Sequence, residues 1–330
     1  MKTVKLGPSG PEISQFGLGA MSFAGIYGNA SEDESFAVMN AVRAAGVTHI
    51  DTSNVYGAGR SEEILGAWFA ANPGAREETT IATKAGITGS PEKRFNNAPD
   101  YLEAELDGSL KRLGIDCVDL FYIHRLEAER PIEEVAGTLA GLIAKGKAKA
   151  VGFSEIAPTS LRRAATEVDV AAVQSEYSLS TRLPELGLSQ ACASLGTSLV
   201  AFCPVGRAFL TDQPFSYERA QSMAFTKGNP RFMEPNYAAN IKATDGFRIL
   251  AKDMGEPAAG VAIAWLMAQG DHVIPIPGTK SVDHFKELLR GTEILLSPSD
   301  MAAIEAVLPI GWAHGDRYSA AQWVGPEMYC

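Results

Sequence analysis

The chain has 330 residues, an ordinary length for one α/β barrel, and its composition of 46% hydrophobic and 21% charged residues is typical of a soluble globular protein. The net charge of −10 argues against binding of nucleic acid or of an anionic membrane over a broad surface. No apolar run reaches the roughly 18 residues that a membrane span needs, and residues 1–5 lack the apolar core of a signal peptide, so we expect a cytoplasmic protein.

Residues 2–13 alternate around Pro8-Ser9-Gly10, a turn signal that predicts a short N-terminal hairpin. After it, apolar strands and amphipathic helices alternate without an internal boundary or low-complexity linker, so we predict a single domain over residues 1–330. The strand candidates are apolar on both faces, as buried parallel strands require. They cover residues 14–20, 47–51, 79–84, 118–124, 148–154, 171–177, 198–204 and 272–276. Eight such strands with intervening helices predict a (β/α)8 barrel.

Several helices begin and end at recognisable signals. Ser31 is followed three residues later by Glu34, which is the pattern of a capping box. Leucines repeat at helical spacing up to Gly114, which stops that helix, and Pro131 stands at a first helical turn. We interpret the leucine stripes as packing surfaces.

The cysteines and histidines give no sign of a metal or disulfide framework. The four cysteines lack a Cys-x-x-Cys spacing, and we interpret Cys117, Cys192 and Cys203 as buried thiols of a reducing cytosol and Cys330 as a free thiol at the chain end. The five histidines form no metal-ligand pattern, so we expect no metal site.

Three successive predicted strands each end on an ionisable residue. Asp51 stands at the tip of one strand and is followed by Tyr56 in a glycine-rich loop, while Lys84 and His124 end the next two strands. A lone aspartate at a strand tip is as often a cap or a turn residue. Because the ends of barrel strands converge on one face, however, these placements together indicate a site.

The four side chains suit the reduction of a carbonyl group. A tyrosine has a pKa of about 10, and a nearby lysine ammonium is expected to lower it. An aspartate keeps that lysine charged and in place, and a histidine can donate a hydrogen bond to a carbonyl oxygen. Together they form a proton donor for a carbonyl that receives a hydride.

With these residues in place, the sequence resembles the aldo-keto reductase family. Asp51, Tyr56, Lys84 and His124 match that family's catalytic tetrad in order and context, and the resemblance extends from about Val4 to Pro309. Two runs are similar to its signatures, Gly17 to Met21 and Asp51 to Gly66. The resemblance implies an NADPH-dependent reductase of a small-molecule aldehyde or ketone, with the hairpin closing the bottom of the barrel.

The resemblance also implies cofactor contacts at the later strand ends. Ser154 and Gln174 match residues that contact the nicotinamide carboxamide, and Tyr177 matches an aromatic residue that stacks on the nicotinamide ring. Glu155 departs from the asparagine that is usual beside the serine. The segment 203–207 is similar to one whose backbone wraps the pyrophosphate. The full set of expected cofactor contacts is Gly19, Met21, Asp51, Ser154, Gln174, Tyr177, Pro204, Val205, Gly206, Arg207, Ile276, Gly278, Thr279, Lys280, Ser281, His284 and Glu287.

The phosphate end of the cofactor is expected where residues 276–281 end the last strand and open a helix, since helix N-termini bind anions. Lys280 supplies a cation for a 2′-phosphate, which favours NADP(H). On the next helix the family commonly has an arginine and a Glu-Asn pair, where this chain has His284, Glu287 and Leu288. Only the glutamate matches, so use of NAD(H) stays open. No GxGxxG follows a first strand, and a Rossmann fold is therefore not supported.

Two segments are expected over the catalytic face. Residues 207–240 form a long aromatic-rich loop after the seventh strand, which is either a packed excursion or a cover over cofactor and substrate. The C-terminal tail from about Pro309 is expected to help close the pocket. Phe23, Tyr27 and Trp312 are candidate substrate-pocket residues, although each is more often a packing residue.

Two other functions stay open from the sequence. One is a redox-sensing or regulatory subunit that binds NADPH with little turnover. The other is a barrel lyase or isomerase with Lys84 in a Schiff base, which its pairing with Asp51 disfavours because a Schiff-base lysine must be neutral to attack. The sequence indicates neither the physiological substrate nor an oligomeric state.

Overall fold

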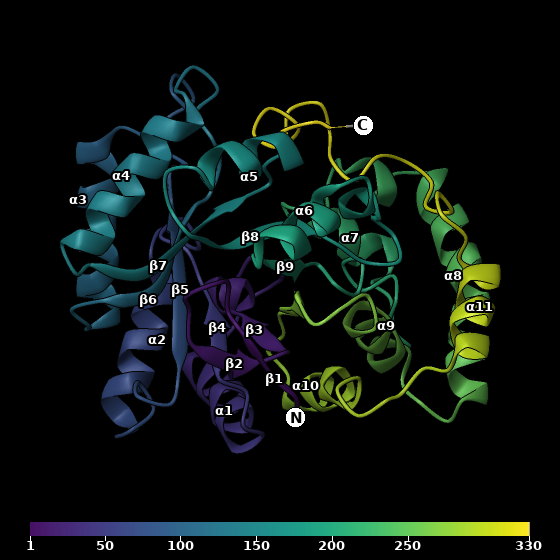
Figure 1. Cartoon of the computed structure of the whole chain (residues 1–330). Coiled ribbons are helices and arrows are strands. Elements are labelled where there is room, and N and C mark those ends of the chain that lie inside the picture. Colours follow the sequence, from purple (N-terminus) through teal and green to yellow (C-terminus); the bar gives the residue numbers. More distant parts are fainter. Residues whose placement is uncertain (330) are drawn as a thin grey trace.

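The computed structural model describes residues 1–329 and contains an eight-stranded parallel barrel (Figure 1). The strands are β3 (Gly17–Gly19), β4 (His49–Asp51), β5 (Thr80–Ala85), β6 (Val118–Ile123), β7 (Ala148–Ser154), β8 (Val170–Glu176), β9 (Ser198–Phe202) and β10 (Val273–Pro275). They neighbour one another in chain order from β3 to β10. The two end strands approach where the Gly19 amide donates to the Pro277 carbonyl over 2.9 Å. The predicted (β/α)8 barrel is confirmed.

The N-terminal hairpin covers the bottom of the barrel. Strands β1 (Thr3–Lys5) and β2 (Glu12–Ser14) pair antiparallel, and Leu6 and Ile13 join the apolar cluster inside the barrel. The Gly7 amide donates to the Ser198 hydroxyl at the start of β9 over 3.0 Å. Because Ser14 belongs to this hairpin, the first barrel strand begins later than the expected residue 14.

Helices surround the barrel (Figure 1). The α-helices are α1 (Glu32–Ala44), α2 (Arg60–Ala71), α3 (Pro99–Leu113), α4 (Ile132–Ala144), α5 (Pro158–Ala164), α6 (Leu188–Leu195), α7 (Tyr217–Ser222), α8 (Asn236–Asp253), α9 (Ala258–Met267), α10 (Val282–Arg290) and α11 (Pro298–Val307). The 3-10 helices are η1 (Ala20–Ala24), η2 (Leu183–Glu185) and η3 (Pro230–Phe232). The predicted capping box of Ser31 and Glu34 begins α1, and Gly114 ends α3 in the left-handed conformation.

The alternation of side chains along each strand divides the core into two layers. On β6, Leu120 and Tyr122 point into the barrel, whereas Phe121 and Ile123 belong to the larger cluster under the helices. Side chains at alternate positions of a strand point to opposite faces. The position of a residue along its strand, which we call its parity, therefore decides whether its side chain can reach the barrel interior. This rule determines which predicted site residues point into the barrel and which point toward the helices.

The segment 207–240 is more ordered than the predicted loop. It contains α7 and η3, and α8 begins within it at Asn236. The rings of Phe209 and Phe232 stack with centroids 4.5 Å apart and form a small apolar cluster with neighbouring residues. The prediction of one long loop is wrong in extent, because these aromatic residues bury enough surface to fold the segment on itself.

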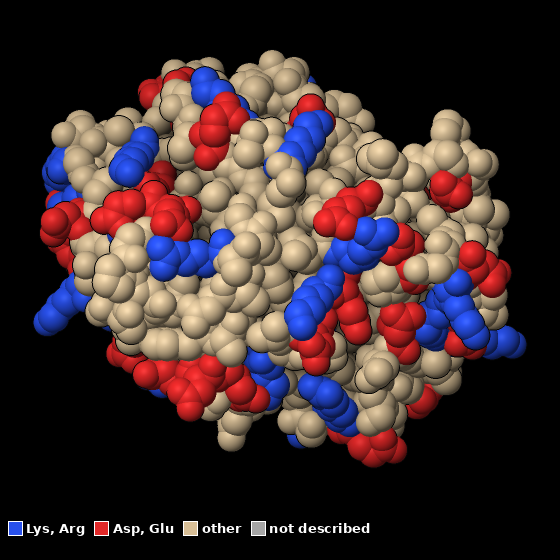
Figure 2. Space-filling model, turned by 90° about the horizontal axis from the view of Figure 1, so that it is seen from below, with Lys and Arg blue, Asp and Glu red and all other residues tan. Residues whose placement is uncertain are grey.

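The two chain ends lie on opposite sides of the molecule. In Figure 1 the yellow C-terminal tail, residues 309–329, runs across the top toward α5, while the N-terminus lies at the bottom. Figure 2 shows the face seen from below, where acidic and basic side chains are intermixed. Within residues 1–329, no helix is long and apolar enough to cross a bilayer.

The three described cysteines are free thiols. Only Cys192 is fully buried, while Cys117 and Cys203 are half-buried, so the expectation of three buried thiols is wrong for two of them. Cys330 lies outside the described residues.

Candidate functional site

The four residues singled out in the sequence meet at the C-terminal end of the barrel. Asp51 ends β4, Lys84 lies near the end of β5, His124 follows β6, and Tyr56 lies in the loop after β4. The buried Lys84 ammonium contacts the Asp51 carboxylate and donates to the Thr52 carbonyl over 2.7 Å. It also donates to the Tyr56 hydroxyl over 3.4 Å. The structure thus brings the expected quartet together.

Burial and charge act in opposite directions on these groups. Burial disfavours the ammonium of Lys84, but the Asp51 carboxylate and Tyr56 outweigh it and raise the pKa of Lys84. Burial also raises the pKa of Tyr56, and the opposing effect of Lys84 does not reverse that shift. Lys84 does act to lower the pKa of Tyr56, as expected. The expectation that this pKa falls below its ordinary value is nevertheless wrong, because burial raises it by more. Tyr56 carries its proton at neutral pH.

His124 lies against Tyr56 with its ring nearly perpendicular, at an interplanar angle of 83° and a centroid distance of 5.9 Å. Burial, together with the charges of Arg125 and Lys84, holds the pKa of His124 well below its ordinary value. Its Nδ1 lies 3.1 Å from the Ser53 hydroxyl oxygen. His124 is accordingly a neutral ring whose position is fixed by a neighbouring hydroxyl.

Gln174 of β8 binds the Asp51 carboxylate from across the barrel. Its Nε2 donates to Oδ2 of Asp51 over 2.8 Å, while Oδ1 of Asp51 faces Lys84. The glutamine expected to contact a nicotinamide carboxamide thus has one donor engaged with Asp51. It retains a second N–H and its carbonyl oxygen for other partners.

Tyr177 does not face the cluster of Asp51, Tyr56, Lys84 and His124. Its side chain is 1% exposed, packs edge-on against Trp265 of α9 at 5.7 Å and donates to Glu185 over 3.0 Å. It follows β8 with the parity opposite to that of Gln174, which directs it outward under the helices. The expectation that Tyr177 stacks on a nicotinamide ring is wrong for this reason.

Ser154 lies beside a cation that the sequence analysis missed. The Arg125 guanidinium donates from Nη1 to the Ser154 hydroxyl over 3.0 Å and to the His124 carbonyl over 2.6 Å. Its charge also acts on Tyr56 and His124, favouring a lower pKa in both. Arg125 could have been predicted as a site residue, because it directly follows His124 after the end of β6.

Arg207 is held in an ion pair rather than left free for phosphate. It donates from Nη2 to the buried Glu176 carboxylate over 2.7 Å and from Nη1 to the Arg317 carbonyl over 3.0 Å. The backbone around it is unusual, since Cys203, Arg207 and Ala208 have φ values of 51°, 52° and 76°. Such strained backbone concentrates at ligand sites. The expected backbone segment Pro204, Val205 and Gly206 lies within this strained turn.

The expected phosphate end gathers around the start of α10. Ser281 caps the helix by accepting a bond from the His284 amide over 3.3 Å, and the Lys280 ammonium donates to the Asn29 carbonyl. The Thr279 carbonyl accepts from the Ser22 hydroxyl over 3.0 Å. His284 is exposed and Glu287 half-exposed on the helix.

The strand ends are close-packed next to this helix. A Cβ at Gly19 would lie 2.9 Å from the Ile276 carbonyl oxygen, and one at Gly278 would lie 2.9 Å from the Gly19 carbonyl oxygen. Larger residues at either glycine would therefore push β3 and β10 apart. Ile276 itself packs in the barrel interior.

The candidate substrate-pocket residues separate into two groups. Phe23 is 1% exposed within the main core, and Trp312 packs in that core and donates to the Leu179 carbonyl over 2.8 Å. Both are packing residues, and their expected pocket role is wrong. Tyr27 is half-buried, with its ring 6.3 Å from that of Phe225, and the expected cofactor contact Met21 is half-buried as well. Burial, with Cys203 nearby, raises the pKa of Tyr27 well above its ordinary value.

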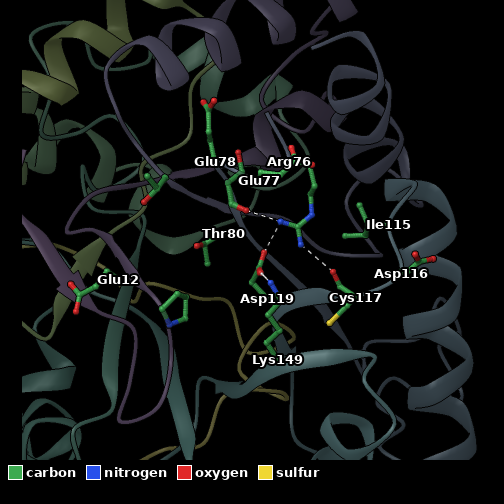
Figure 3. Close-up of a pocket in the computed structure, with 13 residues that line it drawn as sticks. Glu12, Arg76, Glu77, Glu78, Thr80, Ile115, Asp116, Cys117, Asp119 and Lys149 are labelled. Carbon is green, nitrogen blue, oxygen red and sulfur yellow. Dashed lines mark hydrogen bonds and ion pairs between the residues drawn. The ribbon is translucent and has the colours of Figure 1, made fainter. Parts of the chain in front are cut away.

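An open cleft lies at the other end of the barrel (Figure 3). Its central carboxylate, Asp119 at the start of β6, accepts from Arg76 over 2.9 Å, from Lys149 over 2.7 Å and from the Ile81 amide over 2.8 Å. These bonds join the beginnings of β5, β6 and β7. The bonds to Asp119 therefore stabilise the bottom of the barrel. In barrels of this kind the residues at the bottom contribute to stability, and the active site lies at the opposite end.

Comparison with known proteins agrees with this geometry. A family model described as "Aldo/keto reductase family" matches residues 15–309. Aldo-keto reductase yakc [NADP(+)] of Schizosaccharomyces pombe is 37% identical over 312 residues, covering 93% of this chain and 92% of that protein. Probable aldo-keto reductase 1 of Glycine max is 35% identical over 321 residues, covering 96% and 92%. The solved glycerol dehydrogenase AKR11B4 of Gluconobacter oxydans matches with a TM-score of 0.80 at 26% identity, covering 93% of this chain and 94% of that one.

Proposed function

Since the chain belongs to the aldo/keto reductase family of oxidoreductases, we propose that it reduces a small aldehyde or ketone to the alcohol with NADPH, using Tyr56 as the proton donor. The observation that carries this proposal is the Lys84 ammonium, which is bonded to Asp51 and lies 3.4 Å from the Tyr56 hydroxyl oxygen. That arrangement stabilises a phenolate at the moment when the proton leaves. We assign the activity to one barrel domain spanning residues 1–330.

The residues around the barrel mouth fit a phosphorylated dinucleotide. Lys280 and the N-terminal end of α10 offer a cation and the positive end of a helix dipole for a phosphate group. The strained turn at 203–208 lies at the adjacent strand end. The NADP(+) in the name of the relative from Schizosaccharomyces pombe supports the same cofactor for this chain. NAD(H) is a secondary candidate, because His284 and Leu288 replace the family's usual arginine and asparagine.

Each side chain of the quartet has a definite part in the reduction. NADPH, when bound, supplies a hydride to the carbonyl carbon. Tyr56 donates its phenolic proton to the carbonyl oxygen, Lys84 stabilises the resulting phenolate, and the phenolate regains a proton from solvent. Asp51 keeps Lys84 charged, and Gln174 keeps Asp51 in place.

His124 would orient the carbonyl. When the Ser53 hydroxyl donates to Nδ1 at 3.1 Å, the proton of the neutral ring is on Nε2. Nε2 can then donate a hydrogen bond to the carbonyl oxygen of the substrate. The same bond to Ser53 fixes the direction of the ring.

The experiment that tests this function measures loss of NADPH absorbance with a panel of carbonyl compounds that includes 4-nitrobenzaldehyde. We expect multiple turnovers, with one alcohol formed for each NADPH consumed, and slower turnover with NADH. Binding of NADPH without more than one turnover across the panel would contradict the proposal and favour the regulatory alternative. The Schiff-base alternative is disfavoured because the raised pKa of Lys84 keeps its amine protonated.

A cytoplasmic location is part of the same proposal. Cys117, Cys192 and Cys203 are all free thiols, which suits a reducing compartment.

A further inference from the structure

The C-terminal tail crosses the catalytic face and is bonded on both sides of it. On one side Trp312 donates to the Leu179 carbonyl beyond β8 over 2.8 Å. On the other side the Glu327 amide donates to the Glu155 carbonyl over 2.9 Å, and Arg94 donates to the Ala321 carbonyl over 2.8 Å. The tail is therefore attached to strand ends and loops far apart in the sequence.

The centre of the tail is attached through Arg317. This side chain is 5% exposed and makes a two-pronged contact with Glu155, with Nη1 donating to Oε1 over 3.0 Å and Nη2 donating to Oε2. Burial alone would raise the pKa of Glu155, but Arg317 outweighs it, and the carboxyl is held below its ordinary range. Such paired contacts are the strongest and most directional that a carboxylate makes.

Glu176 extends the same cluster to the segment after β9. Its carboxylate accepts from Arg207 over 2.7 Å and from Thr181 over 2.9 Å. The backbone carbonyl of Arg317 accepts in turn from Arg207 over 3.0 Å and from Asn229 over 2.7 Å. The tail and the 207–240 segment are thus one connected cover.

Glu155 connects this cover to the catalytic residues. It directly follows Ser154, whose hydroxyl accepts the bond from Arg125, and it has a left-handed backbone with φ 58°. Gly325 of the tail packs on the same arginine, since a Cβ there would lie 3.0 Å from Arg125 Cδ. Arg125 itself is bonded to the His124 carbonyl. Displacement of the tail would remove the packing of Gly325 on Arg125 and the partner of Glu155 together.

We propose that Arg317 is a positioning residue for the reaction: by binding Glu155 it holds the C-terminal tail over the site and fixes Ser154 and Arg125 beside His124. This inference rests on the proposed function. Arg317 contacts no group of the catalytic quartet in the structure, so it acts through Glu155. Loss of Arg317 removes the ion-pair partner of the buried Glu155 carboxylate, and loss of Glu155 leaves Arg317 with the more distant Glu176 carboxylate at 3.8 Å, so either change releases the tail.

The test compares Arg317→Met and Glu155→Gln with the parent enzyme at a temperature at which all are folded by circular dichroism. We expect kcat for 4-nitrobenzaldehyde to fall by about tenfold to a hundredfold in each single variant, the range for a misplaced active-site group. The double variant should be little worse than either single one, because both remove the same contact. Arg317→Lys keeps the charge without the two-pronged geometry and should recover part of kcat.

Release of the tail is measured independently of turnover. Chymotrypsin cleavage after Tyr318 or Trp323 should be faster in Arg317→Met and Glu155→Gln than in the parent. Arg43→Met, which removes the two-pronged surface contact with Glu78, is the matched control and should leave both cleavage and kcat at parental values.

Parental kcat, within about twofold, together with parental cleavage in Arg317→Met would overturn the proposal. If that variant does not fold, the same result in Glu155→Gln would overturn it. Reduced kcat with parental cleavage would also contradict it, because the tail would then not have moved. Inactivity of the parent enzyme would refute the proposed function instead, and the cleavage assay would still decide whether the ion pair holds the tail.

Discussion

The Lys84 ammonium nitrogen lies 3.4 Å from the Tyr56 hydroxyl oxygen, and the same nitrogen contacts the Asp51 carboxylate. One cation therefore contacts a carboxylate and lies beside the phenol that we propose as the proton donor. Burial favours the neutral phenol before the reaction, and Lys84 favours the phenolate formed in it. The two effects together keep Tyr56 protonated before the reaction and stabilise the phenolate that forms when its proton is transferred.

The direction of these pKa shifts predicts a broad pH plateau. The pKa of Tyr56 is above its ordinary value of 10.0, so the proton donor stays protonated well beyond neutral pH. The pKa of His124 is well below 6.5, so its ring stays neutral through mildly acidic conditions. We expect kcat/KM for carbonyl reduction to be nearly constant between about pH 6.5 and 9. A titration near pH 7 in the pH profile would contradict these protonation states.

Lys280 is expected to distinguish the two nicotinamide cofactors. Replacing it with alanine removes the cation beside the start of α10, so NADPH binding should weaken by about 1.5–3 kcal/mol, while NADH binding changes little. Fluorescence titration of each cofactor measures the two affinities. Lys286→Ala removes an exposed lysine from the same helix and serves as the control. Equal weakening of NADPH and NADH would show that Lys280 does not contact the 2′-phosphate.

His49 is expected to make the fold sensitive to acid. It is fully buried in β4, and both ring nitrogens lack a hydrogen-bond partner within residues 1–329. Burial lowers its pKa, so below about pH 6.5 the unfolded chain gains a proton that the fold excludes, and stability decreases as the pH falls. His49→Leu should reduce the loss of unfolding free energy between pH 7 and 5, by at most about 2 kcal/mol.

Denaturant unfolding at the two pH values measures this effect. The matched control is His314→Leu, which changes an exposed histidine of the tail and should keep the parental pH dependence. An unchanged pH dependence in His49→Leu would show that this ring is not the acid-sensitive group.

Gly66 is expected to be required by helix packing. A Cβ on this residue of α2 would lie 2.3 Å from the Arg112 carbonyl oxygen on α3. Gly66→Ala should therefore lower the free energy of unfolding by about 1–3 kcal/mol. Gly137→Ala in α4 has nothing within 4 Å and should raise it by about 0.5–1 kcal/mol. Similar effects of both changes on thermal unfolding would contradict the packing argument.

The sequence predicted the features that follow from local pattern. All eight barrel strands, the hairpin and the convergence of Asp51, Tyr56, Lys84 and His124 were predicted, because apolar runs and residues at strand ends determine them. The family resemblance placed Tyr177 at the nicotinamide, whereas its position relative to Gln174 directs it toward the helices. Counting alternate residues from Gln174 would have identified the error.

The charged cover over the site could not be predicted in the same way. Glu155 and Arg317 are 162 positions apart in the chain, and no local pattern relates a residue at a strand end to one in the tail. Arg207 was expected near phosphate because a free arginine suits that role, but Glu176 pairs with it in the fold. Phe23 and Trp312 were assigned to a pocket because aromatic residues are common in both pockets and cores. Only the long-range contacts of the folded chain distinguish a ligand-binding role from a packing role for these residues.

The most direct measurement of the central claim is the turnover of Tyr56→Phe with NADPH and a reactive carbonyl compound. This change removes one hydroxyl and keeps the ring against His124, so the fold and the NADPH affinity should be preserved. We expect carbonyl reduction to fall by at least about 10²-fold, the lower range for loss of a general acid. Near-parental turnover by a folded Tyr56→Phe enzyme that binds NADPH normally would contradict the assignment of Tyr56 as the proton donor, and with it the proposed catalytic site.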